Sequence, residues 1–102
     1  MASRLSLHEE LCKILGLRNV YFNPPASVKM KYPCIKYSLS GIDHKRADDS
    51  IYRNTNRYEL VVIDSKPDSD IHEKLLASFP MCSFDRPYIA DNLYHFTLTL
   101  YY

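Results

Sequence analysis

The C-terminal segment from Leu93 to Tyr102 constrains the fold more than any other part of the chain. Side chains two residues apart lie on the same face of a strand, and the large apolar residues of this segment occupy such positions. One face would carry Tyr94, Phe96, Leu98, Leu100 and Tyr102, and the other His95, Thr97, Thr99 and Tyr101. We therefore predict a strand whose first face lies in the hydrophobic core.

Shorter patterns predict the other strands. They are a β-prone run from Val20 to Phe22, a partly alternating stretch from Lys31 to Ser40, an apolar run from Tyr58 to Ile63, and a short strand from Met81 to Arg86 followed by a turn from Tyr88 to Asn92. Pro24 and Pro25 must end the first of these, because proline lacks an amide donor. The change from half-polar to wholly apolar residues along 58–63 indicates a strand that crosses the centre of the sheet.

Two segments predict amphipathic helices. The first begins with a capping box of Ser6 and Glu9, and the second repeats this pattern with Asp70 and Glu73. In both, apolar side chains follow at helical spacing. They are Leu7, Leu11, Ile14 and Leu15 before Gly16, and Ile71, Leu75 and Leu76 before Pro80.

The segment from Gly41 to Asn56 is rich in charge and has few residues that could enter a core. It predicts a long hairpin arm or loop. The order of helix, strands, helix and strands favours an α/β fold of the α+β type, with a mixed, mostly antiparallel sheet and two helices packed on one face. A chain of 102 residues has a common single-domain size, so residues 1–102 should form one domain.

Charge and hydropathy exclude several classes of partner. Thirteen Lys and Arg against twelve Asp and Glu give a formal net charge of +1, too weak to steer the molecule onto nucleic acid or an anionic membrane. No apolar run approaches the roughly 20 residues that span a bilayer, and Met1 to Glu10 lacks the apolar block of a secretory signal. Cys12, Cys34 and Cys82 lie in apolar patterns, which is typical of reduced, buried cysteines.

Catalytic and cofactor motifs are missing from the sequence. His8 and Cys12 could share a helical face, but a zinc site needs three or four protein ligands, and the other histidines fall in three different segments. There is no G-x-S-x-G elbow, and two glycines, Gly16 and Gly41, cannot build a glycine-rich phosphate loop. We therefore predict a protein that is not an enzyme and binds no metal or other cofactor.

Two further patterns are weaker signals of a functional site. Glu59 and Asp64 flank an apolar strand, as the metal-binding acids of some nucleases do, but a solvent-facing Glu59 and a turn at Asp64 are favoured. Several basic residues lie among tyrosines and could contact single-stranded nucleic acid. They are Lys29, Lys31, Lys36, Lys45, Arg46, Arg53 and Arg57. Acids interrupt this set, which favours a solvated loop or a salt-bridged subunit contact.

Nine tyrosines and no tryptophan are unusual for so short a chain. Each buried tyrosine hydroxyl needs a hydrogen-bond partner, and tyrosine is enriched in protein contacts. The count supports assembly, although ordinary strand-forming tyrosines account for it equally well.

Three stretches in this order resemble the small tail terminator, or tail-completion, proteins of long-tailed phages and prophages. The first is NVYFNPP (19–25), continued by MKYPCIKY (30–37). The second is the charged segment DHKRADDSIYRNTNRYELVVID (43–64), and the last is FDRPYIADNLYHFTLTLYY (84–102). Together they cover nearly the whole chain.

The resemblance implies a homohexameric ring that caps the tail tube, stops tube polymerisation and presents a surface to the head connector. It places the protein in the virion, in the tail or neck, after assembly in the host cytoplasm. The implied partners are other copies of the chain, the tail tube protein and the head connector or head-closure protein, with DNA passing through the ring only as cargo and no membrane. The alternatives are a head-closure adaptor of the neck and a small nucleic-acid-binding accessory protein.

Contacts with a neighbouring subunit or the tube are expected in the arm and near the C-terminus. The predicted residues are Asp43, His44, Lys45, Arg46, Asp48, Asp49, Tyr52, Arg53, Arg57, Arg86 and Tyr88. Asp91, Asn92, Leu93 and His95 also match the family pattern, but a tight turn at Asp91 and Asn92 explains them at least as well.

Overall fold

The computed structural model describes residues 4–25, 27–47 and 50–102, and for residues 43–47 and 50–54 it describes the backbone alone. Within these ranges the chain forms two helices and five strands. In chain order they are α1 (Arg4–Leu15), β1 (Val20–Phe22), β2 (Cys34–Ala47), β3 (Ser50–Asp64), α2 (Ile71–Ser78), β4 (Cys82–Ala90) and β5 (Leu93–Tyr101). The predicted α+β fold is confirmed.

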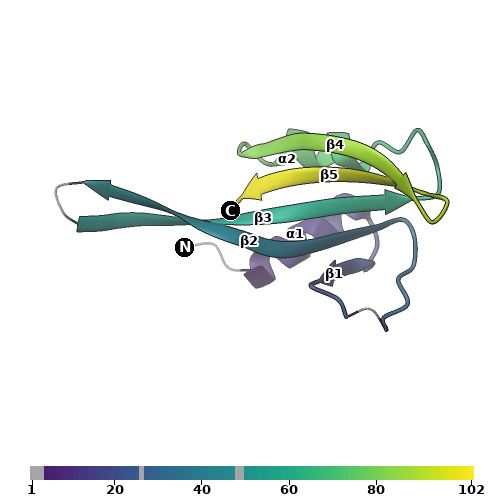
Figure 1. Cartoon of the computed structure of the whole chain (residues 1–102), viewed down its shortest axis with the longest axis horizontal. Coiled ribbons are helices and arrows are strands. Elements are labelled where there is room, and N and C mark those ends of the chain that lie inside the picture. The colour runs from purple at the N-terminus through teal and green to yellow at the C-terminus, as the bar shows by residue number, and fades with distance from the viewer. Residues whose placement is uncertain (1–3, 26, 48–49) are drawn as a thin grey trace.

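The strands form one mixed sheet in the order β1-β2-β3-β5-β4, as Figure 1 shows. β1 runs parallel to β2, and the other three pairings are antiparallel. β3 lies at the centre, where Leu60 and Val62 face one side of the sheet and Val61 and Ile63 the other, all four buried. This is the strand that the apolar run at 58–63 predicted.

Both helices pack on the same face of the sheet, as predicted, and lie behind it in Figure 1. Leu7 and Leu11 of α1 and Leu75 of α2 are completely buried against it. The sheet contributes Val20, Ile35, Tyr37, Tyr58, Leu60, Val62, Phe96, Leu98 and Leu100 to the same cluster. The alternation of the last strand therefore identified the core face correctly.

The other face of the sheet, which we call the open face, carries a smaller apolar cluster at one end. Cys34, Val61 and Ile63 are buried there, and Tyr21, Met30 and Leu93 pack against them. The Tyr21 hydroxyl accepts a hydrogen bond of 3.1 Å from the amide of Lys31, which ties the loop before β2 to this cluster. β2 itself begins at Cys34 and not at Lys31, because Pro33 has no amide to donate.

The predicted start of the first helix is wrong. α1 already includes Arg4, so Ser6 lies within the helix and does not precede it. The Ser6 hydroxyl oxygen lies 2.6 Å from the Tyr102 hydroxyl oxygen, and the Glu9 carboxylate pairs with Arg18 at 3.0 Å. The side chains of Ser6 and Glu9, which the sequence pattern assigned to a capping box, thus contact residues outside the helix.

The second helix also departs from its predicted cap. Asp70 occupies the N-cap position of α2, but its side chain makes no capping hydrogen bond. The Asp70 carboxylate instead lies 3.8 Å from the Lys74 ammonium, one helical turn away.

β4 is longer and its turn is shorter than predicted. β4 reaches Ala90, so Tyr88 lies in a strand, and only Asp91 and Asn92 connect it to β5. These two residues have φ of 53° and 61°, which is the geometry of a two-residue turn that matches strand twist. A register shift between Phe84 and Arg86 marks a bulge, and the strand continues beyond it to Ala90.

The turn predicts a stability effect at Asn92. Replacing Asn92 with Val should lower the free energy of unfolding by about 1–2 kcal/mol, because a β-branched residue is strained in the left-handed region. Replacing it with Gly should leave the protein at least as stable as the natural chain. Urea unfolding of the three proteins measures the difference, and equal stability of the Val and Gly variants would contradict this geometry.

Candidate assembly surfaces

The hairpin of β2 and β3 extends beyond the rest of the sheet. The last pairing of β5 with β3 joins Tyr101 to Arg57, whereas β2 and β3 stay paired as far as Ala47 and Ser50. Residues 43–47 and 50–55, which we call the arm, therefore form a two-stranded ribbon that, among the described residues, pairs only with itself, and Figure 1 shows it projecting along the long axis. The molecule measures 51 × 26 × 23 Å as a result. The predicted arm is thus a hairpin and not a loop.

The described backbone of the arm is a hairpin of two strands. An isolated two-stranded hairpin is at best marginally stable in water, and both of its edges present unpaired backbone groups. The continuous sequence from 43 to 55, which includes Asp48 and Asp49, carries three acids and three Lys or Arg residues, so its formal charge is balanced. A balanced ribbon is better matched to a protein surface of mixed charge than to the uniformly negative backbone of nucleic acid.

Most of the predicted contact residues belong to this arm. Asp48 and Asp49 lie outside the described residues, and so do the side chains of Asp43, His44, Lys45, Arg46, Tyr52 and Arg53. The backbone places all the described positions of this set on the arm. Arg57 lies where the arm begins, and its guanidinium hydrogen-bonds to Ser40 on the facing strand.

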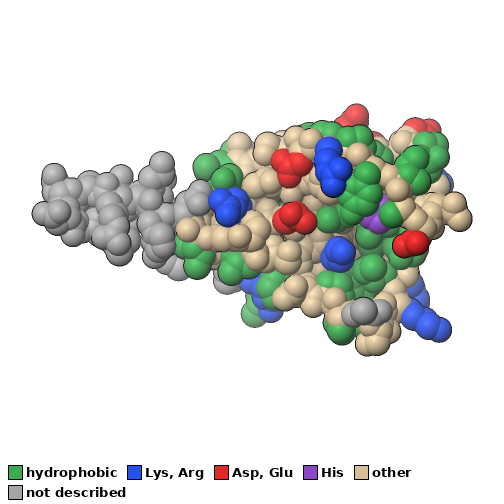
Figure 2. Space-filling model, in the orientation of Figure 1, with side chains coloured by type: hydrophobic (Ala, Val, Ile, Leu, Met, Phe, Trp, Pro, Cys, Tyr) green, Lys and Arg blue, Asp and Glu red, His purple; other side chains and the backbone are tan. Residues whose placement is uncertain are grey.

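The two C-terminal contact residues lie on the open face at the far strand. Arg86 is exposed, and its guanidinium carbon lies 5.3 Å from the centre of the Tyr88 ring. The Tyr88 ring in turn stacks on His95 of β5, with 4.6 Å between ring centres. The structure therefore joins Arg86, Tyr88 and His95 in one row across β4 and β5. Figure 2 shows this side of the molecule, where acidic and basic side chains lie among hydrophobic ones.

The outer edge of the sheet was not singled out from the sequence. β4 ends the sheet, and the exposed apolar side chains Met81, Phe84 and Ile89 lie on or beside it, Ile89 being 68% exposed. A hollow of about 430 Å³ adjoins it, lined by Pro67, Pro87, Tyr88, Ile89, Tyr94, His95 and Phe96. An apolar edge of this kind is typical of a contact surface, but its signal in the sequence is weak because these residues fit a core pattern equally well.

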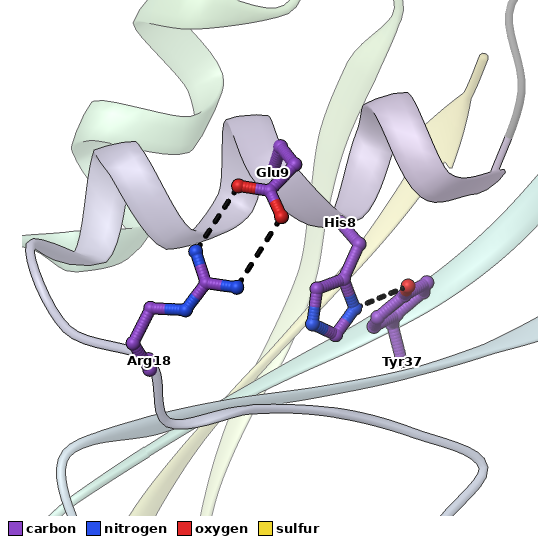
Figure 3. Close-up of polar contacts among 4 residues, drawn as sticks. All are labelled: His8, Glu9, Arg18 and Tyr37. Carbon is purple, nitrogen blue, oxygen red and sulfur yellow. Dashed lines mark hydrogen bonds and ion pairs between the residues drawn. The ribbon is translucent and has the colours of Figure 1, made fainter.

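His8 of α1 packs against the sheet. Figure 3 shows His8 reaching down to the sheet, where its Nδ1 atom lies 2.8 Å from the Tyr37 hydroxyl oxygen. The Arg4 guanidinium donates to the same hydroxyl at 3.4 Å, and Glu9 holds Arg18 through two hydrogen bonds. Among the residues that the structure describes, no group of three His, Cys, Asp or Glu side chains could hold a metal ion.

The His8 contact predicts a pH dependence of stability. Burial, and next the nearby Arg4 guanidinium, hold the pKa of His8 below its usual value of 6.5. The unfolded chain therefore binds this proton more readily than the folded one, so stability should fall as the pH drops through the usual value and level off below the folded pKa. Urea unfolding of the natural chain and of His8→Gln between about pH 7.5 and pH 5.5 isolates the contribution of His8 to the pH dependence of stability. The variant should show a weaker pH dependence, and an unchanged slope would contradict the assignment.

Glu59 and Asp64 do not form a shared acidic site. Glu59 is exposed on the open face, whereas Asp64 is buried on the helix face, where its carboxylate accepts the amide of Lys66 at 3.1 Å. At the ~3.4 Å rise of a strand they stand about 17 Å apart along β3. The turn at Asp64 and the exposed Glu59 were both predicted.

Comparison with known protein families and with curated proteins finds no match to this chain. Over residues 4–25, 27–47 and 50–102, no helix is long and apolar enough to cross a membrane.

Proposed function

We propose that this protein is a phage tail terminator, a structural virion protein that forms a ring, caps the tail tube and stops its polymerisation. In this proposal it is not an enzyme, and the ring also presents the surface to which the head connector or head-closure protein binds. The observation that carries the proposal is the arm, a ribbon over residues 43–47 and 50–55 that, in the part of the chain that the structure describes, pairs only with itself. Such a ribbon is expected to gain its stability from a second molecule.

The arrangement of the two candidate surfaces supports a ring. Identical subunits that join head to tail need two different contact surfaces, and the ring closes only if each step repeats the same rotation. The arm is the extension of β2 and β3 beyond the end of the sheet. The apolar edge lies at β4, which is separated from β3 by β5. Two distinct surfaces are therefore available on one subunit, and the sequence resemblance indicates a hexamer.

The chemistry of these surfaces favours a protein partner. The sequence from 43 to 55 is balanced in charge, and the open face carries both signs on Lys36, Glu59, Asp85 and Arg86. A ring built from such surfaces could surround DNA as cargo without holding it, since tight binding requires many phosphates to be neutralised.

The proposal is tested by adding purified protein to growing tail tubes and measuring tube length by electron microscopy. Tubes should stop growing and show extra density at one end. Incubation with separated heads and separated tails distinguishes the tail terminator from the head-closure adaptor, which would bind heads first. Growth that continues at the same rate, with no bound density on any tube, would overturn the proposal. Strong binding to single-stranded DNA that weakens steeply with salt would favour the accessory-protein alternative.

A further inference from the structure

The arm begins at an irregularity in β2. Leu39 pairs with Tyr58 and Gly41 pairs with Arg57, so Ser40 is an extra residue in this strand. An extra residue of this kind is a β-bulge, which bends the strand and increases its local twist. The bulge lies beside the last pairing of β3 with β5, and the two-stranded arm begins immediately beyond it.

Arg57 is hydrogen-bonded across this bulge. Its Nε atom donates to the Ser40 hydroxyl at 3.3 Å, and its Nη2 atom donates to the Ser40 carbonyl oxygen at 3.3 Å. The Ser40 hydroxyl donates in turn to the Arg57 carbonyl oxygen at 3.0 Å. Three hydrogen bonds between one residue on each strand thus hold the bulge in one shape.

Gly41 provides the space for the Arg57 guanidinium. A Cβ atom at position 41 would overlap the Nη2 atom of Arg57 and would lie only 3.0 Å from its Cζ atom. The guanidinium is the far end of a flexible side chain, so Gly41→Ala could be accommodated by moving it. The hydrogen bonds to Ser40 would then be lost while the backbone pairing of β2 and β3 could remain.

We propose that Ser40, Gly41 and Arg57 form a clamp that fixes the direction in which the arm leaves the sheet, and thereby sets how identical subunits close into a ring. The second part rests on the proposed function. At ~3.4 Å per residue the arm is about 20 Å long, so a tilt of about 10° at its base displaces its tip by about 3–4 Å. A displacement of that size changes the rotation between neighbours, and a ring whose rotation no longer closes becomes an open helical assembly.

The clamp is tested with Gly41→Ala, Arg57→Ala and the double variant. Residual dipolar couplings of the backbone amides, measured by NMR, report the orientation of the arm relative to the sheet without requiring assembly. Both single variants should show a loss or shift of these couplings in the arm and not in the sheet. The double variant should match Arg57→Ala, because the same contact is already gone. Arg18→Ala is the control, since Arg18 pairs with Glu9 on α1 and should leave the arm couplings unchanged.

Electron microscopy of the same proteins tests the effect on assembly. The natural chain and Arg18→Ala should give closed rings of one size, and both clamp variants should give mixed sizes or open arcs. If Arg57 acted only as a contact residue, Gly41→Ala would leave the rings unchanged, and this would overturn the role of the clamp in closure. Arm couplings that are unchanged in both single variants would overturn the clamp itself. If the natural chain forms no rings while the couplings respond, the proposed function fails and the clamp stands.

Discussion

Replacing residues 43–55 with a two-residue Asn-Gly turn between the paired residues Ile42 and Asn56 is expected to abolish assembly and leave a folded single chain. Among the side chains that the structure describes, the buried core residues lie in the helices, at Phe79 just after α2, and in the parts of the strands outside the arm. The free energy of unfolding should therefore change by less than about 1 kcal/mol, apart from the effect of a shorter loop. Sedimentation equilibrium measures the association, and urea unfolding measures the stability.

A matched control for this deletion is Lys66→Ala, an exposed side chain in the connection between β3 and α2. It should assemble like the natural chain. A deletion variant that still forms the same assembly would show that the arm is not a subunit contact. A deletion variant that unfolds would show that the arm stabilises the body and would contradict the separation of the two.

Leu98→Ala is expected to have the largest effect on stability among single core substitutions. Leu98 is completely buried in the middle of β5, where it is paired with Leu60 on one side and Phe84 on the other. Removing its side chain leaves a cavity between the sheet and the helices, and such changes lower the free energy of unfolding by about 2–5 kcal/mol. Domains of this size are typically stable by only about 5–15 kcal/mol, so the loss is a large fraction of the total.

The control for Leu98 is its neighbour on the opposite face of the same strand. Thr99 donates a hydrogen bond of 2.7 Å to the Asp85 carboxylate at an exposed position. Thr99→Val keeps the branched shape and removes that bond, so its effect should stay near or below about 1 kcal/mol. Comparable losses in the free energy of unfolding of both variants would show that the hydrophobic core does not lie on the helix side of the sheet. Guanidinium or urea unfolding of the two variants gives both values.

The sequence predicted the elements whose signal is periodic. Alternation along 94–102 and the apolar run at 58–63 are set by burial on a pleated strand, so they identified the central strands and the face that packs on the helices. Contacts between distant residues could not be seen in this way. The hydroxyls of Ser6 and Tyr102 meet across 96 positions, so the local capping pattern at Ser6 was misleading.

β4 illustrates a second kind of error. The sequence predicted a strand that ends at Arg86, but the Thr97 hydroxyl accepts the amide of Arg86 at 3.1 Å and donates to its carbonyl oxygen at 2.8 Å. These bonds satisfy the backbone at the bulge, so the strand can continue to Ala90. A side chain on a neighbouring strand therefore decided where this element ends.

The candidate contact surfaces were predicted in part. Charge content alone identified the segment that forms the arm, because residues that cannot enter a core must lie outside it. Two contacts depend on the register between neighbouring strands. One is the row of Arg86, Tyr88 and His95, and the other is the packing of the Arg57 guanidinium over Gly41. Register is fixed by packing of the whole sheet, so neither could be derived from spacing in the sequence.

The most direct test of assembly is the native mass of this chain as its concentration is raised. We expect a closed assembly of one size, a hexamer on the sequence resemblance, that persists on dilution into tail-tube preparations. A chain that stays single at its highest soluble concentration, and also in the presence of tube ends, would contradict it.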